Sequence, residues 1–283
     1  MKIDYHTHIG REQEHYANAK DFLREARLMR QDATVTMDVD PEAHRQAMQD
    51  VEKAIVLAFR STHLGFNVDN DYVAAYVRTD PDKFIGFLSV DPHEANCMEE
   101  LERAYFDLGL RGIKMSPIYQ AFHPMDERIL PVYKFAEQHG LPILIHQGAT
   151  FPRRAPLKYA HPAMLEDVAL AFPELRVIIA HLGHPWEHET IVLIRKQPHF
   201  YADLSGLFYR PWQLYNSLLL CQEYGVMHKL LPGSDYPVST PAEADAGLRR
   251  INDFLEGTKL PRIREEAIEE ILARDYLAEL NLA

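Results

Sequence analysis

The chain has 283 residues, 47% of them hydrophobic, and a formal net charge of -12 at pH 7. This length allows a large core, either in one barrel or in two smaller domains. The negative charge and the lack of a long Lys/Arg run argue against a nucleic-acid partner, because phosphate binding requires a concentrated basic surface.

Three features bear on where the protein works. The N-terminal residues lack the succession of basic, apolar and small residues that marks a signal peptide. The longest apolar runs, such as residues 217–221, fall far short of the ~20 residues of a membrane span. Cys97 and Cys221 lack the spacing of a zinc or redox pair, so we expect buried thiols in a reducing compartment. These features predict a cytoplasmic protein with no membrane partner.

Apolar, β-rich segments alternate with helical stretches along the chain, which is the pattern of parallel βα units. There are eight such segments, at residues 2–8, 53–59, 84–90, 110–116, 141–148, 175–183, 199–206 and 229–237. Their nearly continuous hydrophobicity is typical of strands covered on both faces. An open doubly wound sheet is the competing architecture. Eight regular units without a GxGxxG turn favour an α/β fold with a closed (β/α)8 TIM barrel.

Several helices between these strands have recognisable ends. One is expected over residues 91–109, with Asp91 as N-cap; others over 126–140 and 239–257, each ending at a glycine. No low-complexity linker or composition break interrupts the chain, so residues 1–283 are predicted to form one domain. Residues 262–282 are then a helical C-terminal coat.

The first connection, residues 11–52, is longer than a simple βα connection. It could be a lid, a small insertion or the contact of a homodimer. Charge and periodicity do not choose among these three.

Polar side chains recur where the predicted strands end, which is where a parallel barrel builds its active site. Strand alternation places Asp4, His6 and His8 on one face of the first strand. Each group alone has a structural explanation, such as a bond to a backbone carbonyl or a capped turn. The convergence of all of them on one rim favours a site, and the candidates are His6, His8, Lys114, His146, His181 and Asp235.

Three neutral imidazoles and a carboxylate suit one zinc or similar divalent ion per chain and leave a position for water. Such an ion lowers the pKa of bound water to about 7. His181 would then lie behind the ligands or face the substrate, where it could move a proton or polarise a carbonyl. Asp235 could bind the ion and also accept the proton of its water.

The chain resembles the amidohydrolase superfamily in five segments taken in order, namely DYHTHIG, GIKMSP, LIHQG, AHLGHPW and GSDYPV. The resemblance is to the amidohydrolase-related branch, which includes aminocarboxymuconate semialdehyde decarboxylase and related aromatic-acid decarboxylases. It covers the whole chain. It implies a (β/α)8 barrel with His181 as the catalytic histidine and one metal ion held by His6, His8, His146 and Asp235. It also implies hydrolysis or carbon–carbon cleavage of a small carbonyl or carboxylated substrate.

Two residues leave alternatives open within this resemblance. Lys114 lies where other branches carry a carboxylated lysine that bridges two metals; as an ordinary ammonium it would instead bind a substrate carboxylate, which we favour for a branch that usually holds one metal. His184 could contact substrate, serve as a spare ligand, or simply begin a helix.

Further candidates for substrate binding lie in two loops. Arg153 and Arg154 are adjacent, so at most one faces inward, where it could hold a carboxylate; otherwise both are solvated. Tyr209, Arg210 and Trp212 form a rim cluster in which an aromatic ring could stack on substrate or anchor packing.

Three functions compete. The first is a metal-dependent hydrolase in which activated water attacks an amide, ester or lactone. The second is a nonoxidative decarboxylase, a lyase, acting on a small unsaturated or aromatic acid. The third is a metal-binding barrel without turnover, against which the open ligand position and His181 both argue. We favour hydrolysis by analogy, because it is the commonest chemistry of the superfamily.

Overall fold

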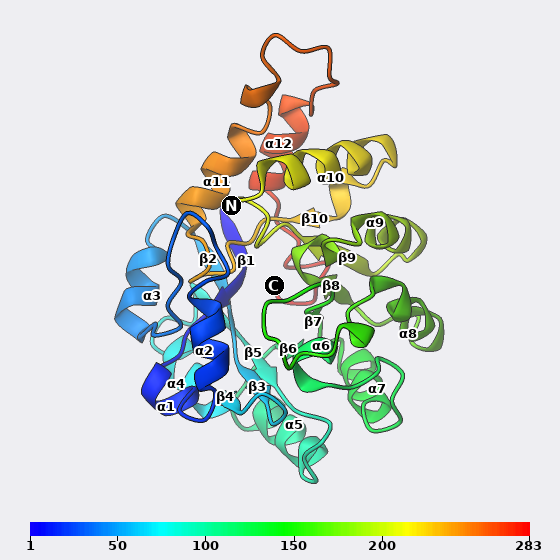
Figure 1. The fold of residues 1–283 in the computed structure, drawn as a ribbon. Helices are drawn as coiled ribbons and strands as arrows, with labels where there is room; N and C mark the ends of the chain where they lie inside the picture. The colour runs from blue at the N-terminus through cyan, green and yellow to red at the C-terminus, as the bar shows by residue number, and fades with distance from the viewer.

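Parallel strands form a ring in this computed structural model, which describes residues 1–283 (Figure 1). The ring contains β1 (Ile3–His8), β2 (Lys53–Leu57), β5 (Phe84–Ser89), β6 (Gly112–Met115), β7 (Ile143–Ile145), β8 (Val177–Ile179), β9 (Phe200–Asp203) and β10 (Leu230–Leu231). Each strand pairs in parallel with the next one in this order. Backbone hydrogen bonds from Tyr5 N to Pro232 O (3.0 Å) and from His8 N to Tyr236 O (2.8 Å) join the last strand region to the first. The predicted (β/α)8 barrel is confirmed.

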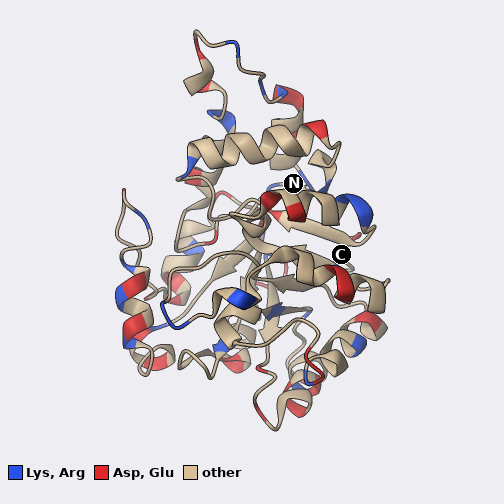
Figure 2. Ribbon diagram, turned by 45° about the vertical axis from the view of Figure 1, so that its right-hand side comes forward, with Lys and Arg blue, Asp and Glu red and all other residues tan.

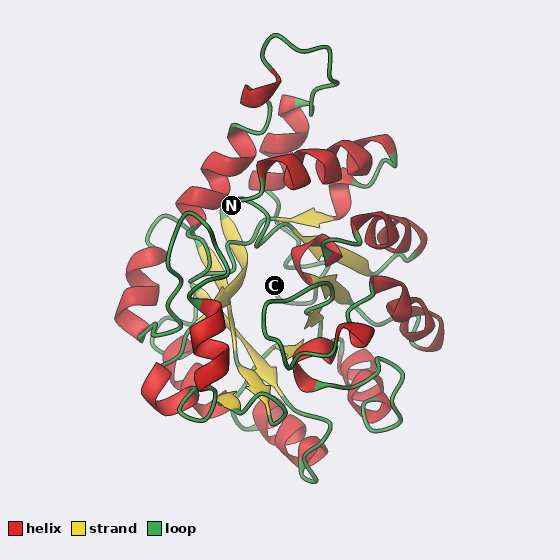
Figure 3. Cartoon of the chain, viewed as in Figure 1, coloured by secondary structure: helices red, strands yellow, loops and turns green.

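Helices surround this ring on its outer face (Figure 3). They are α4 (Asn70–Val77), α5 (Cys97–Phe106), α7 (Leu130–His139), α8 (Leu165–Ala171), α9 (Glu187–Lys196), α10 (Pro211–Glu223), α11 (Pro241–Arg249) and α12 (Glu265–Leu272). The predicted end of α7 is confirmed, because Gly140 adopts the left-handed conformation (φ 64°) that a C-cap favours. The start of α11 is fixed by a capping box in which the Thr240 and Glu243 side chains each bond the other's backbone N–H.

Several helix boundaries differ from those expected; α7, for example, begins at Leu130 and not at residue 126. The prediction that Asp91 caps a helix is wrong, because α5 begins only at Cys97. The Asp91 carboxylate instead accepts hydrogen bonds from Thr62 N (2.8 Å) and Thr62 Oγ1 (2.9 Å), which hold a neighbouring loop. Helix α11 ends at Arg249, and a separate 3₁₀ turn (Asp253–Leu255) follows it.

The C-terminal residues close one end of the barrel. Buried side chains from the strands, including Ile3, Tyr5 and Leu231, form an interior cluster with Leu277, Leu280 and Leu282. The segment after α12 is therefore more than a coat, since it contributes apolar side chains to the barrel interior. This packing leaves the opposite end, at the carboxyl ends of the strands, for the site.

The first connection carries α1 (Glu12–His15), α2 (Lys20–Ala26) and α3 (Pro41–Ala47) and lies beside the mouth of the ring (Figure 1). A hairpin of β3 (Phe59–Ser61) and β4 (Phe66–Val68) and the short α6 (Pro117–Gln120) lie on the same side. Phe22, Met29 and Met37 of the connection line the cavity described below. This segment thus forms part of the wall of the site.

Acidic and basic residues are spread over the outer helices and loops (Figure 2). No helix combines the length and the apolar character needed to cross a membrane. Cys97 and Cys221 are both buried and unpaired, as predicted.

Candidate metal centre

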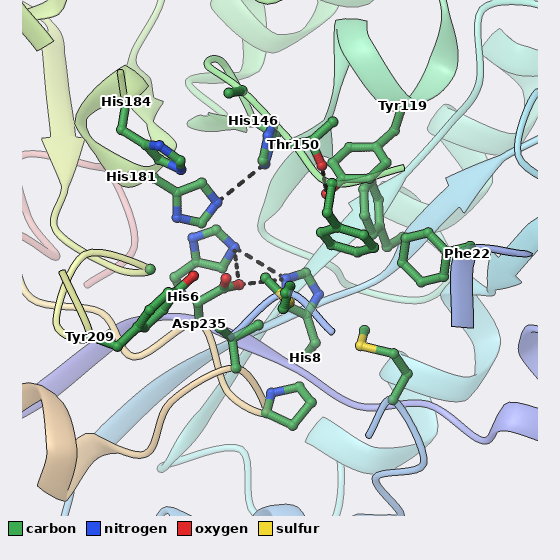
Figure 4. A pocket seen from close by; sticks show the side chains of 18 of the residues that line it. His6, His8, Phe22, Tyr119, His146, Thr150, His181, His184, Tyr209 and Asp235 are labelled. Carbon is green, nitrogen blue, oxygen red and sulfur yellow. Dashed lines mark hydrogen bonds and ion pairs between the residues drawn. The ribbon is translucent and has the colours of Figure 1, made fainter. Parts of the chain in front are cut away.

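A cavity of about 230 Å³ opens at the carboxyl ends of the strands. Figure 4 shows imidazoles and a carboxylate at its base, with Tyr119 and Phe22 on one side and Tyr209 on the other. The cavity contains the six residues predicted from the strand ends: His6, His8, Lys114, His146, His181 and Asp235. The structure therefore brings together groups from five strands that lie far apart in the sequence.

The first strand supplies two of these groups, His6 and His8, but its side chains do not alternate regularly between the two faces. Pairing with β2 shifts between Asp4 and Thr7, so β1 contains one extra residue at this point. Tyr5 packs in the barrel interior, and His6 and His8 face the cavity. Asp4 does not line the cavity, so the expectation that it shares their face is wrong. Its Oδ1 instead accepts hydrogen bonds from the backbone N–H groups of His6 and Ser234.

The candidate ligand atoms converge on the Asp235 carboxylate. Asp235 Oδ1 lies 3.3 Å from His6 Nε2 and 3.4 Å from His8 Nε2. The two Nε2 atoms are 3.1 Å apart. One ligand atom from each of His6, His181 and Asp235 lies within 4.8 Å of the others. His146 completes the group, with its Nδ1 atom 3.2 Å from His181 Nε2.

Two of these residues adopt an uncommon backbone conformation. His181 (φ 56°) and Asp235 (φ 57°) are both in the left-handed region, which costs energy for residues other than glycine. Each lies just beyond the end of a strand, β8 or β10, where the turn directs its side chain into the cavity. Strain of this kind is concentrated at functional sites.

The hydrogen-bond network assigns the protons of three imidazoles, those of His6, His181 and His146. His6 Nδ1 donates to Asp203 Oδ2 (2.9 Å), which leaves the lone pair on His6 Nε2. His181 Nδ1 donates to the carbonyl of Ser205 (3.0 Å), so its Nε2 accepts from His146 Nδ1. The lone pair of His146 then lies on Nε2, a buried atom that has no hydrogen-bond partner.

Burial gives these groups the charges that metal ligands need. It lowers the pKa of His6, His8 and His146, so the imidazoles are neutral near pH 7. Burial alone would raise the pKa of Asp235, but the neighbouring histidines outweigh it and hold the pKa below its usual range. Neutral imidazoles and an ionised carboxylate fit a divalent cation, and a ligand role would satisfy the buried Nε2 of His146, which has no hydrogen-bond partner.

Sequence reasoning missed Asp203, which ends β9. This fully buried carboxylate accepts hydrogen bonds from His6 Nδ1 and from the backbone N–H groups of His181 and Ser205 (both 3.0 Å). The Ser205 hydroxyl also bonds Asp203 and lies 2.8 Å from His181 Nδ1. The available signal was a carboxylate at a strand end in HFYADLSG. Asp203 therefore orients two histidines of the site.

Replacing Asp203 with asparagine is expected to weaken metal binding by about 10- to 100-fold, the usual effect of removing a carboxylate that orients a ligand histidine. Asparagine keeps the size but loses the charge that fixes the proton on His6 Nδ1. Competition against a metal chelator measures this affinity. The exposed Asp167→Asn variant is the control, and equal affinities in the two variants would contradict the assignment.

Lys114 points at the ligand group rather than at solvent. Its side chain is buried, and its Nζ atom lies 3.1 Å from His6 Nε2 and over the ring of Phe59. Burial lowers the pKa of Lys114 to about 8, against the attraction of Asp235 and Asp203. The amine is therefore placed next to the reacting centre.

The first connection is tied to the histidine strand through His44. His44 is fully buried, and its Nε2 atom bonds the Oγ1 atom of Thr7 (2.9 Å). Thr7 is the residue between His6 and His8. The Thr7 hydroxyl donates to Ile55 O (2.6 Å), so His44 Nε2 is the donor in this contact. His44 Nδ1 then accepts from the Tyr76 hydroxyl (2.9 Å).

This buried imidazole predicts a loss of stability in acid. Burial lowers the pKa of His44 to about 3, against about 6.5 for an exposed histidine. Between these values the unfolded chain binds more protons, so the free energy of unfolding falls as the pH falls below about 6.5. From about pH 7.5 to about pH 5.5, His44 is expected to account for a loss of about 1.4 kcal/mol.

Urea denaturation at the two pH values, in the wild type and in a His44→Gln variant, measures this contribution. The variant is expected to be less stable at the higher pH but to lose less stability on acidification. Equal pH dependence in both proteins would contradict a neutral buried His44.

The remaining predicted residues divide into two groups. His184 and Tyr209 line the cavity. Arg153 and Trp212 do not: Arg153 is exposed in a neighbouring surface groove, and Trp212 is 62% exposed in the first turn of α10. The structure does not bring these two residues to the cavity. Arg210, which immediately precedes α10, lines the cavity instead.

Solved structures with the same fold extend over nearly the whole chain. An uncharacterised TIM-barrel protein from Bordetella bronchiseptica is 23% identical, with a TM-score of 0.72, and the match covers 99% of this chain and 97% of that one. A 5-carboxyvanillate decarboxylase from Sphingomonas paucimobilis is 16% identical, with a TM-score of 0.67 and coverage of 100% and 99%. A probable 2-pyrone-4,6-dicarboxylic acid hydrolase from Acinetobacter baumannii is 17% identical, with a TM-score of 0.62 and coverage of 96% and 99%.

The sequence is also similar to a dihydroorotase of Helicobacter pylori, at 31% identity over 116 residues. The match spans 38% of this chain and only about a third (32%) of that protein's length. The model of the family described as Amidohydrolase matches residues 3–272, which is nearly the whole chain. The resemblance expected from the sequence is thereby confirmed, and with it the expectation of an enzyme: the chain belongs to the amidohydrolase family.

Proposed function

We propose that the protein is a metal-dependent hydrolase that cleaves an amide, ester or lactone bond in a small substrate. The observation that carries the proposal is the contact of Asp235 Oδ1 with the Nε2 atoms of both His6 and His8, beside His181. An ionised carboxylate among neutral imidazoles can bind a cation and accept a proton at the same place.

The ligands in this proposal are His6, His8, His146 and Asp235, and the ion is one zinc per chain. When bound, zinc would polarise the substrate carbonyl and make water acidic enough to attack near pH 7. The donor set supports zinc, because imidazole nitrogen and carboxylate oxygen are its usual ligands when thiolates are absent. We also propose a cytoplasmic location, supported by the two unpaired buried cysteines.

The residues of the chain then divide the proton transfers. Asp235 accepts a proton from the attacking water and returns it to the leaving nitrogen or oxygen, so no net proton is consumed in cleavage. His181 lines the same space, and its Nε2 lone pair, which accepts from His146 Nδ1 in the structure, would take or pass on a proton of the reacting groups. The amine of Lys114, next to His6, would bind a carboxylate or carbonyl oxygen of the substrate near the reacting bond.

Nonoxidative decarboxylation of an unsaturated or aromatic acid is the second candidate. Aromatic side chains line one side of the cavity, and Tyr119 packs edge-on against His146 with 4.9 Å between ring centroids. A ring could lie against this wall. The fold shared with a 5-carboxyvanillate decarboxylase is compatible with this chemistry.

A substrate screen that records proton release and carbon dioxide release in parallel separates the two candidates. Lactones, esters, amides and unsaturated acids are tested on metal-loaded protein, with Asp235→Asn as the inactive control. The hydrolase proposal predicts acid formation from a lactone or ester without carbon dioxide. If an acid releases carbon dioxide with the wild type but not with Asp235→Asn, the hydrolase proposal is wrong and the protein is a decarboxylase.

A further inference from the structure

Two guanidinium groups lie against the ring of Tyr209 at the edge of the cavity. The Cζ atom of Arg30 is 4.9 Å from the ring centroid, and that of Arg210 is 4.3 Å away. Arg30 comes from the first connection and Arg210 from the loop before α10. Both guanidinium groups are therefore within cation–π distance of the same ring.

The two arginines differ in how fully their donors are used. Arg30 bonds the carboxylates of Asp32 and Glu243 and the carbonyl of Val238, so each of its three side-chain nitrogens has a partner. Its role is to fix the first connection to the barrel. Arg210 makes one hydrogen bond within the protein, from Nη1 to Gly206 O (2.6 Å), and forms no ion pair with a carboxylate. Its remaining donors are free for a ligand.

The charge of the cavity lining favours an anion. Lys114 and Arg210 are the two basic residues among the lining side chains, and Asp235 is the one carboxylate. This local excess of positive charge contrasts with the net charge of -12 of the whole chain. An anion that enters the cavity would meet its only unpaired guanidinium at Arg210.

Away from these charges the cavity is apolar. Phe22, Phe59, Tyr119 and Phe151 pack against one another, with centroid separations of 5.3 Å for Phe22–Phe151 and 5.4 Å for Phe59–Tyr119. In Figure 4, Tyr119 and Phe22 lie across the imidazole group from Tyr209. The cavity thus has an apolar wall on one side and the Arg210 guanidinium on the other, beside Tyr209.

We propose that Arg210 is a specificity-determining residue that binds a carboxylate of the substrate other than the group that reacts. The inference rests on the proposed function and defines its substrate class: an apolar or aromatic molecule with a cleavable carbonyl group at one end and a carboxylate at the other. Lys114 differs in role, because its contact with His6 places it at the reacting centre. Arg210 forms its own contacts with Tyr209 and Gly206.

Calorimetric binding to the metal-loaded protein tests this proposal without requiring turnover. The probes are 2-, 3- and 4-acetylbenzoate, which carry an uncleavable carbonyl and one carboxylate, each compared with its acetylbenzamide, in which the carboxylate is replaced by a neutral group of the same shape. The proteins are the wild type, Arg210→Met, and Arg153→Met as a matched arginine outside the cavity. Arg210→Lys tests whether charge alone suffices, and thermal unfolding confirms that each variant is folded.

The wild type and Arg153→Met are expected to bind at least one acetylbenzoate about 10-fold or more tightly than its acetylbenzamide. Arg210→Met is expected to lose this preference while binding the acetylbenzamide as before, with Arg210→Lys between the two. A preference that survives in Arg210→Met, or that is missing in the wild type, would overturn the proposal. Because binding is measured, a protein that prefers the carboxylate probe but hydrolyses nothing would overturn the proposed function alone.

Discussion

Replacing Asp235 with asparagine is expected to lower kcat/KM by about 100- to 10,000-fold, the usual contribution of a positioned proton acceptor. In the structure Asp235 Oδ1 contacts the Nε2 atoms of His6 and His8, and the surrounding histidines keep the carboxylate ionised. Asparagine retains the shape but accepts no proton, and it is a weaker metal ligand. Steady-state kinetics at saturating metal separate the loss of proton transfer from the loss of metal.

The exposed Asp167→Asn variant is the control for this substitution, because it removes the same charge far from the cavity lining. It is expected to retain wild-type kinetics. An Asp235→Asn protein with nearly full activity at saturating metal would show that another group takes the proton.

Replacing His181 with asparagine is expected to lower kcat by about 100- to 10,000-fold while the protein still binds one metal ion at saturation. His181 Nε2 faces the reacting space, and its Nδ1 proton is held by the Ser205 carbonyl. His6, His8, His146 and Asp235 remain as ligands in the variant. Metal content and turnover are measured on the same preparation.

The two readouts assign the role of His181. Loss of metal together with activity would place His181 among the ligands, since its ligand atom lies within 4.8 Å of those of His6 and Asp235. Unchanged activity would remove it from the mechanism. The matched control is His161→Asn, a histidine outside the cavity lining.

The barrel could be predicted from the sequence because its strands are nearly continuous apolar runs and its helices end at glycines such as Gly140. These signals are local. The boundary of α5 could not be predicted, because the Asp91 carboxylate is used by Thr62, a contact across 29 positions of the chain. A capping residue and a loop anchor look alike in sequence when the partner is distant.

The residues of the site likewise include some that local sequence predicts and one that it does not. His6, His8, His146, His181 and Asp235 could be found because polar side chains at strand ends stand out against apolar strands. Asp203 was missed because a single carboxylate before a loop is common, and its function depends on its contacts with two histidines.

The choice between the candidate arginines could not be made from the sequence. Arg153 and Arg210 both lie in loops that follow strands, and only the tertiary structure shows that Arg210 lines the cavity while Arg153 lies in a neighbouring surface groove. Nothing in the sequence of residues 11–52 indicates that Phe22 packs against Phe66 and Phe151. Phe22 and Phe151 line the cavity. Such contacts are set by tertiary packing rather than by the pattern of neighbouring residues.

Metal analysis of the purified protein, combined with removal and return of the metal, tests the central claim most directly. We expect about one divalent ion per chain, loss of turnover when a chelator removes it, and recovery when zinc is returned. The Asp203→Asn protein should lose its metal at a lower chelator concentration than the wild type. A metal-free preparation that is fully active would contradict the account.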